Sequence, residues 1–122
     1  MRRLARPGYA WAWVAVALAA VCAWAFERVV VEGPSMLPTF APGDRLLLVR
    51  RARRLRVGDV VAVADPRLAS RRLIKRVSAI TGGDVELAGD NPSASTDSRA
   101  FGTVRAAAVR HLVVRRYASA RP

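Results

Sequence analysis

The chain has 122 residues, 52% of them hydrophobic, and a formal net charge of +12 from 21 basic and 9 acidic residues. This length allows one small domain plus an appendage and excludes a second full core. The positive charge favours anionic partners such as lipid headgroups or nucleic acid. Because Cys22 is the sole cysteine of the sequence, an intrachain disulfide and a cysteine metal cluster are excluded.

The N-terminal part of the sequence is apolar. Residues 9–26 carry no charged side chain and would span roughly 27 Å as a helix. Basic residues precede this segment, which predicts a single-pass anchor in the plasma membrane with the N-terminus in the cytoplasm and the rest outside. A cleaved signal peptide is the alternative, because Ala-Trp-Ala at 23–25 fits a cleavage site. The expected organisation is a basic terminus (1–8), an anchor (9–26), a domain (27–118) and a tail (119–122).

The remainder of the chain alternates short β-prone runs with turn residues. Each run has strand length, is rich in Val, Leu and Ile, and is bounded by Gly, Pro, Asp or Asn. This pattern predicts an all-β domain of small antiparallel sheets or a partly open barrel. The runs are ERVVVEG, RLLLVR, GDVVAVADP, RRLIKRVSAI, DVELA and RHLVVRRY.

The first turn after the apolar segment holds a serine in a rigid setting. In VEGPSMLPTFAPGD, Pro34 restricts the backbone before Ser35, and Gly33 would let another backbone approach closely. Pro38 and Pro42 stiffen the exit. Such a turn suits a nucleophile, although a surface turn containing serine would look similar.

A nucleophilic serine needs a base, and the sequence offers two residues. His111 lies among basic strand residues and is more simply a half-exposed strand histidine. Lys75 is the one lysine among 20 arginines, within the apolar run RRLIKRV. Arginine cannot accept a proton, whereas burial and the neighbouring cations Arg72 and Arg76 would favour the neutral amine of Lys75. An ordinary exposed strand lysine is the alternative.

Three motifs in order resemble one known family. GPSMLPT is followed by IKRV with Gly83-Asp84, and then by GDN with Ser95 and DSR. Together they resemble the type I signal peptidase family of Ser/Lys proteases, peptidase family S26, over residues 29–104. The chain resembles its minimal end, since only residues 85–88 lie between Gly83-Asp84 and the GDN turn.

The resemblance implies roles for individual residues. Ser35 matches the nucleophile, Lys75 the general base and Ser95 the hydroxyl that orients the amine. The backbone amide of Ser35 would donate to the oxyanion, and Gly33 stands where some members carry a second donor. The residues that match structural support of the site are Gly33, Pro34, Gly89, Asp90, Asn91, Asp97 and Arg99, and those that match walls of the substrate pocket are Val29, Val31, Met36, Phe40, Leu73 and Ile74.

The resemblance also implies the substrates and partners. We expect a membrane-anchored endopeptidase that removes N-terminal leaders after small residues of the Ala-x-Ala type, with polypeptides and membrane lipid as partners. No cofactor, metal or nucleic acid is expected, and the oligomeric state stays open. An alternative is a dedicated maturation protease for nickel superoxide dismutase, because GDNPSASTDSRAFG resembles the sequence of a small actinobacterial branch of the family that is proposed to process this dismutase. A non-enzymatic alternative is a basic module that binds a membrane surface or nucleic acid through Arg50, Arg51, Arg53, Arg54 and Arg56.

Overall fold

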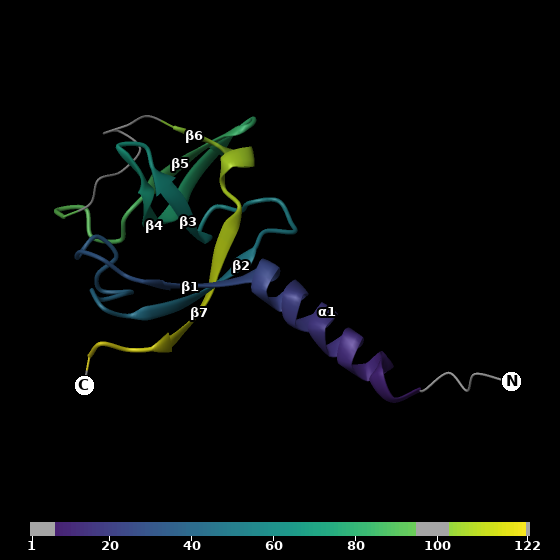
Figure 1. The fold of residues 1–122 in the computed structure, drawn as a ribbon. Helices are drawn as coiled ribbons and strands as arrows, with labels where there is room; N and C mark the ends of the chain where they lie inside the picture. Colours follow the sequence, from purple (N-terminus) through teal and green to yellow (C-terminus); the bar gives the residue numbers. More distant parts are fainter. Residues whose placement is uncertain (1–6, 95–102, 122) are drawn as a thin grey trace, which may run out of the picture.

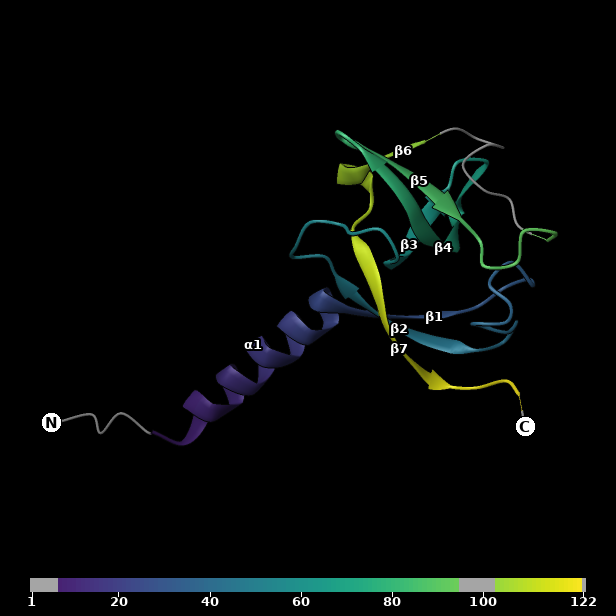
Figure 2. The ribbon, with the colours of Figure 1, turned by 180° about the vertical axis from the view of Figure 1, so that it is seen from behind.

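A helix and a β domain make up the fold. The computed structural model describes residues 7–94 and 103–121. A short 3-10 turn, η1 (Pro7–Tyr9), leads into α1 (Ala10–Ala25), which continues directly into the first strand, β1 (Phe26–Val30). In both views α1 projects away from the β domain and covers neither face of its sheet (Figures 1 and 2).

The expected transmembrane segment over residues 9–26 is corrected by the structure. The α1 helix has 16 residues, about 24 Å of helix against about 30 Å of hydrocarbon core. It ends because Phe26 adopts an extended backbone, with φ −118° and ψ 143°, and starts β1. No helix among residues 7–94 and 103–121 is both long enough and apolar enough to cross a membrane.

Within residues 7–94 and 103–121, seven antiparallel strands form one open sheet, which confirms the expected all-β class. The order across the sheet is β1-β2-β7-β3-β4-β5-β6, so that β1 and β6 lie at its edges. Each of the six predicted runs contains a strand, and the two-residue β6 was not foreseen because it is too short to show a pattern. Beyond β1, the strands are β2 (Arg45–Arg50), β3 (Val60–Asp65), β4 (Leu68–Thr81), β5 (Asp84–Ala88), β6 (Val104–Arg105) and β7 (His111–Ala118), with a 3-10 turn η2 (Ala106–Ala108).

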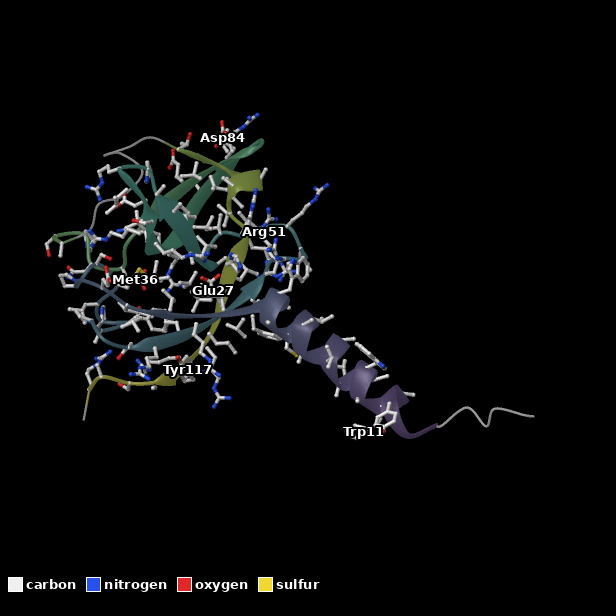
Figure 3. The ribbon with its side chains drawn as sticks, in the orientation of Figure 1. Trp11, Glu27, Met36, Arg51, Asp84 and Tyr117 are labelled. Atoms are coloured by element: carbon white, nitrogen blue, oxygen red, sulfur yellow. The ribbon has the colours of Figure 1, made fainter. Side chains whose placement is uncertain are left out.

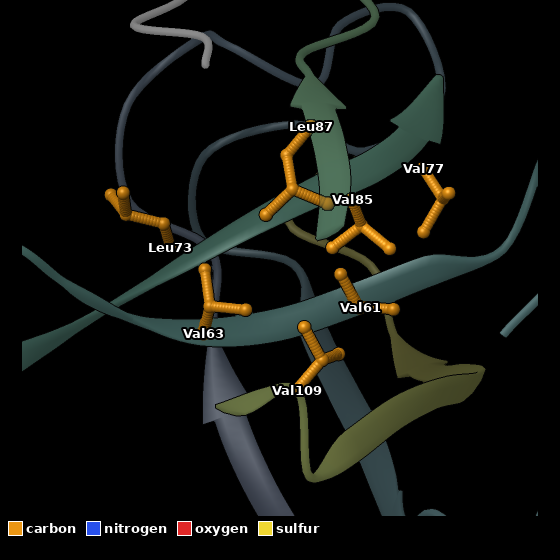
Figure 4. Close-up of a cluster of buried hydrophobic side chains, with 7 residues drawn as sticks. All are labelled: Val61, Val63, Leu73, Val77, Val85, Leu87 and Val109. Atoms are coloured by element: carbon orange, nitrogen blue, oxygen red, sulfur yellow. The ribbon is translucent and has the colours of Figure 1, made fainter. Parts of the chain in front are cut away.

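The sheet folds over into two halves, each with its own apolar cluster. Successive side chains of a strand point to opposite faces, so β3 gives Val61 and Val63 to one cluster and Ala62 to the other. The first cluster, drawn in Figure 4, consists of Val61, Val63, Leu73, Val77, Val85, Leu87 and Val109. The second consists of Val31, Met36, Leu46, Leu48, Ala62 and Ile74.

A loop between β1 and β2 carries the predicted serine, and backbone hydrogen bonds close its base. The Val31 amide donates to the Asp44 carbonyl oxygen (2.8 Å), and the Gly43 amide donates to the Val31 carbonyl oxygen (2.8 Å). The fully buried Asp44 carboxylate accepts from the amides of Ala41 (2.9 Å) and Ala120 (2.8 Å). The loop is thus tied to the C-terminal segment 72 or more residues away.

Asp44 makes the stability of this loop dependent on pH. The backbone hydrogen bonds from Ala120 and Ala41 lower the pKa of Asp44, and Arg116 at 3.3 Å adds to this against the opposing effect of burial. A carboxyl group whose pKa is lower in the folded state stabilises the fold above its unfolded pKa of about 3.9. That stabilisation disappears as the pH falls through the folded pKa.

We therefore expect Asp44→Asn to lower the midpoint of urea unfolding at pH 7 and to flatten its decline in acid. The neutral amide cannot replace the charge that Arg116 and the two backbone amides stabilise. Urea unfolding followed by circular dichroism from pH 7 to pH 3 measures this. Asp84→Asn, at an exposed carboxylate of β5, is the control. If the midpoint of urea unfolding fell equally with pH in wild type and in Asp44→Asn, the role given to Asp44 would be contradicted.

Candidate active site

Ser35 lies on a turn that begins the loop between β1 and β2. Gly33 has φ +73°, a conformation that favours glycine. A Cβ added at Gly33 would meet no atom within 4 Å, so the glycine is required by its backbone angle and not, as expected, by the approach of another backbone. The Leu37 amide donates to the Pro34 carbonyl oxygen (3.2 Å), and fully buried Met36 anchors the turn in the second cluster.

Asn91 holds the backbone on both sides of the serine turn. Its amide N–H donates to the Ser35 carbonyl oxygen (2.9 Å), and its side-chain Nδ2 donates to the Pro34 carbonyl oxygen (3.1 Å). The Ser93 hydroxyl in turn donates to Asn91 Oδ1 (2.9 Å) and fixes the orientation of the amide group. The GDN turn, 57 residues away in the sequence, therefore positions Ser35 through its main chain.

Asp90 connects the same turn to β4. Its two carboxylate oxygens accept from Nε (2.9 Å) and Nη2 (2.8 Å) of Arg76, and one also accepts from the Thr39 hydroxyl. The Arg76 contact lowers the pKa of Asp90, with Thr39 contributing and burial opposing. Arg76 also donates to the Gly58 carbonyl oxygen (2.8 Å). The pairing of Arg76 and Thr39 with Asp90 was not predicted, because only the folded chain brings these residues together.

Lys75 is buried in β4, with 2% of its surface exposed, opposite Val61 of β3. The two arginines beside it are both paired with carboxylates. Nη2 of Arg72 lies 3.0 Å from Oε2 of Glu27. Arg76 forms the bidentate pair with Asp90 described above. These carboxylates partly offset the charges of Arg72 and Arg76, and the burial that the sequence predicted for Lys75 is confirmed.

Ser35 and Lys75 line the same pocket, which has a volume of about 120 Å³. Four of the expected wall residues also line it, namely Val31, Met36, Leu73 and Ile74. All four are buried and belong to the apolar clusters as well. Val29 and Phe40 do not line this pocket and instead pack against the second cluster.

Two strand edges border the pocket. β1 is an edge strand of the sheet, and the pairing of β4 with β5 begins only at Arg76. The pocket is lined by Val30 and Val31 on one side and by residues 71–75 of β4 on the other. Backbone groups on such edges can pair with an extended peptide.

Other predicted residues lie elsewhere. Ser95, Asp97 and Arg99 fall outside the described residues. His111 lines a different hollow, with Nε2 at 3.5 Å from Glu27, and burial followed by the charge of Arg72 lowers its pKa. Gly89 precedes Asp90 in the turn described above.

Among the arginines of residues 50–56, Arg51 and Arg53 make side-chain hydrogen bonds within the fold. Arg51 donates to the carbonyl oxygens of Val109 (2.7 Å), Arg53 (2.7 Å) and Ala106 (2.9 Å). Arg53 forms a bidentate pair with Asp59, 2.9 Å for each contact. These contacts give both arginines a structural role apart from any ligand, since Arg51 joins the loop to η2 and Arg53 ties the loop to Asp59.

We expect Asn91→Asp to lower kcat by about tenfold to a hundredfold, because an aspartate cannot donate to Pro34 and the serine turn would shift. Asn91→Ala should lose activity similarly. Asn91→Asp loses the hydrogen bond to Pro34 and Asn91→Ala also loses the one from Ser93, at a cost of about 1 kcal/mol of unfolding free energy for each bond. Peptide-cleavage kinetics alongside urea unfolding measure both. A kcat within twofold of wild type for both variants would contradict the positioning role.

Comparisons with known proteins identify relatives of the chain. The family model described as signal peptidase, peptidase S26, matches residues 4–89, a span that includes Ser35 and Lys75. The chain is 32% identical to mitochondrial inner membrane protease subunit 1 of Schizosaccharomyces pombe, covering 75% of this chain and 73% of that protein. It is 38% identical to mitochondrial ATP-independent inner membrane protease subunit 1a of Arabidopsis thaliana, covering 61% and 60%. Identity to the Xenopus tropicalis subunit 1 is 33%, covering 73% and 68%.

Proposed function

The chain belongs to the signal peptidase family, peptidase S26, and we propose that it is a serine endopeptidase that removes leader peptides with a Ser35/Lys75 dyad. One observation carries the assignment of the dyad. Ser35, on a turn clamped by Asn91, and Lys75, buried in β4, line one pocket. An extended substrate could pair through its main chain with the strand edges beside that pocket.

In the proposed mechanism, the neutral Lys75 amine takes the proton of the Ser35 hydroxyl as Oγ attacks the substrate carbonyl carbon. The Ser35 amide N–H stabilises the resulting oxyanion. The Lys75 ammonium then gives its proton to the leaving nitrogen, and the C–N bond breaks. A water molecule, deprotonated by Lys75, attacks the carbonyl carbon of the ester on Ser35. The C–Oγ bond then breaks, Ser35 Oγ takes the proton back from the Lys75 ammonium, and the product leaves with a new carboxylate.

Burial is what suits Lys75 to this role. A protonated amine is costly to bury, and Lys75 is 2% exposed, so we expect the pKa of Lys75 to lie below that of a free lysine. Both neighbouring arginines are held by carboxylates and point their charge toward Glu27 and Asp90. The proposed base is thus a lysine whose environment, and not its sequence neighbours, disfavours the charged form.

The size of the pocket supports a preference for small residues before the cut. At about 120 Å³ it has little room beside the branched side chains of Val31, Leu73 and Ile74. Alanine fits such a space, and we infer that it holds larger side chains, phenylalanine above all, less well. We therefore propose Ala-x-Ala type sequences as the substrate class.

The setting of the reaction is proposed from the relatives. Their names place them at a mitochondrial inner membrane, and we infer that this chain also works at a membrane, on polypeptides that carry a leader. The narrower alternative, maturation of nickel superoxide dismutase, depends on residues 89–102, of which 95–102 lie outside the described residues. Deleting the gene and sequencing the N-termini of exported proteins and of any such dismutase separates the two.

The direct test is cleavage of synthetic leader peptides by the purified full chain, with products identified by mass spectrometry. We expect cleavage after the second alanine of Ala-x-Ala and at least about a tenfold loss when leucine replaces either alanine. Equal cleavage of the alanine and leucine peptides would overturn the proposed specificity. No cleavage of any leader peptide would overturn the proposed function.

A further inference from the structure

Two further hollows continue from the active-site pocket along β1 and β4. The first has a volume of about 340 Å³ and shares Val30, Glu32 and Arg71 with the pocket. The second, of about 670 Å³, shares Glu27 and Ser70 with the first. Arg72 lines all three, so they form one trough beside the open edge of β1. In Figure 3, Met36 lies near the loop end of β1 and Glu27 lies near the α1 end. The trough therefore runs from the serine turn toward α1.

The length of the trough matches several residues of extended chain. Glu27 and Val31 are four positions apart on β1, which corresponds to roughly 13 Å at the usual strand rise. A peptide strand whose reacting carbonyl group lies at Ser35 would therefore place a residue four to seven positions away in the far hollow. We call this hollow the arginine hollow, defined by Arg50, Arg72 and Arg110 together with Glu27 and His111.

The arginine hollow carries a surplus of positive charge. Among the described residues that line it, Glu27 is the one carboxylate, and its Oε2 lies 3.0 Å from Nη2 of Arg72. Arg50 and Arg110 remain as two further cations in its lining. The guanidinium of Arg50 stacks on the Trp24 ring at 4.3 Å, and its buried Nε has no hydrogen-bond partner within the part of the chain that the structure describes. This is a site in which an anion would be stabilised.

One wall of the arginine hollow indicates which side of a substrate reaches it. Ala23 and Trp24, at the end of the uncharged and exposed α1 helix, form this wall. The apolar core of a leader precedes the cleavage site by a few residues and would find an apolar neighbour in α1. The hollow therefore faces residues on the N-terminal side of the scissile bond.

We propose that the arginine hollow binds an acidic side chain of the leader, four to seven residues before the scissile bond. This specificity rests on the proposed function, because it needs a peptide held at Ser35. Continuity with the active-site pocket through Arg72 favours a peptide carboxylate over a lipid phosphate as the occupant.

The test uses a series of Ala-x-Ala peptides with Glu, Gln or Lys placed in turn at each of the four positions. For wild type, we expect Glu at the best position to lower KM by about three- to tenfold relative to Gln, with kcat little changed and Lys the poorest. Arg50→Gln and Arg110→Gln should each reduce that preference. Arg54→Gln, at an exposed arginine outside the trough, should leave it intact.

A binding measurement separates this specificity from the chemistry. Fluorescence anisotropy of labelled peptides on the Ser35→Ala protein should show tighter binding of the Glu peptide, weakened by Arg110→Gln. That result would support the hollow even if no peptide were cleaved, in which case only the proposed function would fail. Because Arg110 is exposed, its variant tests the hollow should Arg50→Gln fail to fold.

Two outcomes would overturn the proposal. The first is equal KM and equal binding for Glu and Gln peptides at all four positions. The second is that Arg50→Gln and Arg110→Gln weaken binding to phosphatidylglycerol vesicles, relative to phosphatidylcholine vesicles, while the preference for the Glu peptide is unchanged. That second outcome would assign the hollow to a lipid phosphate.

Discussion

Ser35→Ala is expected to abolish peptide cleavage, with a loss in kcat of at least about 1,000-fold. The methyl group cannot attack a carbonyl carbon, and no acyl-enzyme can form. Because Ser35 is only half-buried and the turn is held through backbone groups of Pro34 and Ser35, the fold should be retained. Single-turnover cleavage assays and urea unfolding measure the two properties.

A matched control for this change is Ser78→Ala, at an exposed serine of β4 outside the pocket. It should leave kcat within about twofold of wild type. Residual activity of Ser35→Ala above about a tenth of wild type would exclude Ser35 as the nucleophile.

Lys75→Met is expected to cause a similar loss of activity. Methionine has about the length of lysine and no basic nitrogen, so the pocket keeps its volume and loses its base. Urea unfolding measured beside the cleavage assay shows whether the variant keeps its fold. A stable but inactive Lys75→Met protein would therefore separate catalysis from structure.

Lys75→Arg supplies the complementary variant, because it keeps the positive charge and cannot accept a proton. It should be as inactive as Lys75→Met, although the larger guanidinium is expected to destabilise the pocket. Appreciable cleavage by either variant would exclude Lys75 as the base. Cleavage that rises with pH through a single ionisation in wild type is the further expectation for a base that works only when neutral.

The strands were predictable because their signals are local. Runs such as RLLLVR and DVELA combine β-branched or aliphatic residues with flanking turn formers, and each forms a strand where the pattern placed it. The C-terminal end of the helix could not be predicted in the same way. Phe26 continues the apolar run, and only the pairing of β1 with β2 draws it out of the helix and shortens the segment expected to span a membrane.

The contacts that hold the candidate site were not predictable, because they join residues far apart in the chain. Asp44 accepts from Ala120 across 76 positions, and Asn91 donates to Pro34 across 57. Asp90 was expected as part of a turn, yet its pairing with Arg76 depends on how β4 lies against that turn. Composition did single out Lys75, and its burial could be inferred only from the apolar residues beside it.

Formation of an acyl-enzyme on Ser35 tests the central claim most directly. The wild-type chain is mixed with a leader-peptide p-nitrophenyl ester ending in alanine, quenched in acid within seconds, digested and mapped by mass spectrometry. A Ser35/Lys75 dyad predicts the acyl mass on the fragment that contains Ser35 in wild type, and its absence in Ser35→Ala and Lys75→Met. An acyl group on another residue, or equal labelling of Ser35 in the Lys75→Met protein, would contradict it.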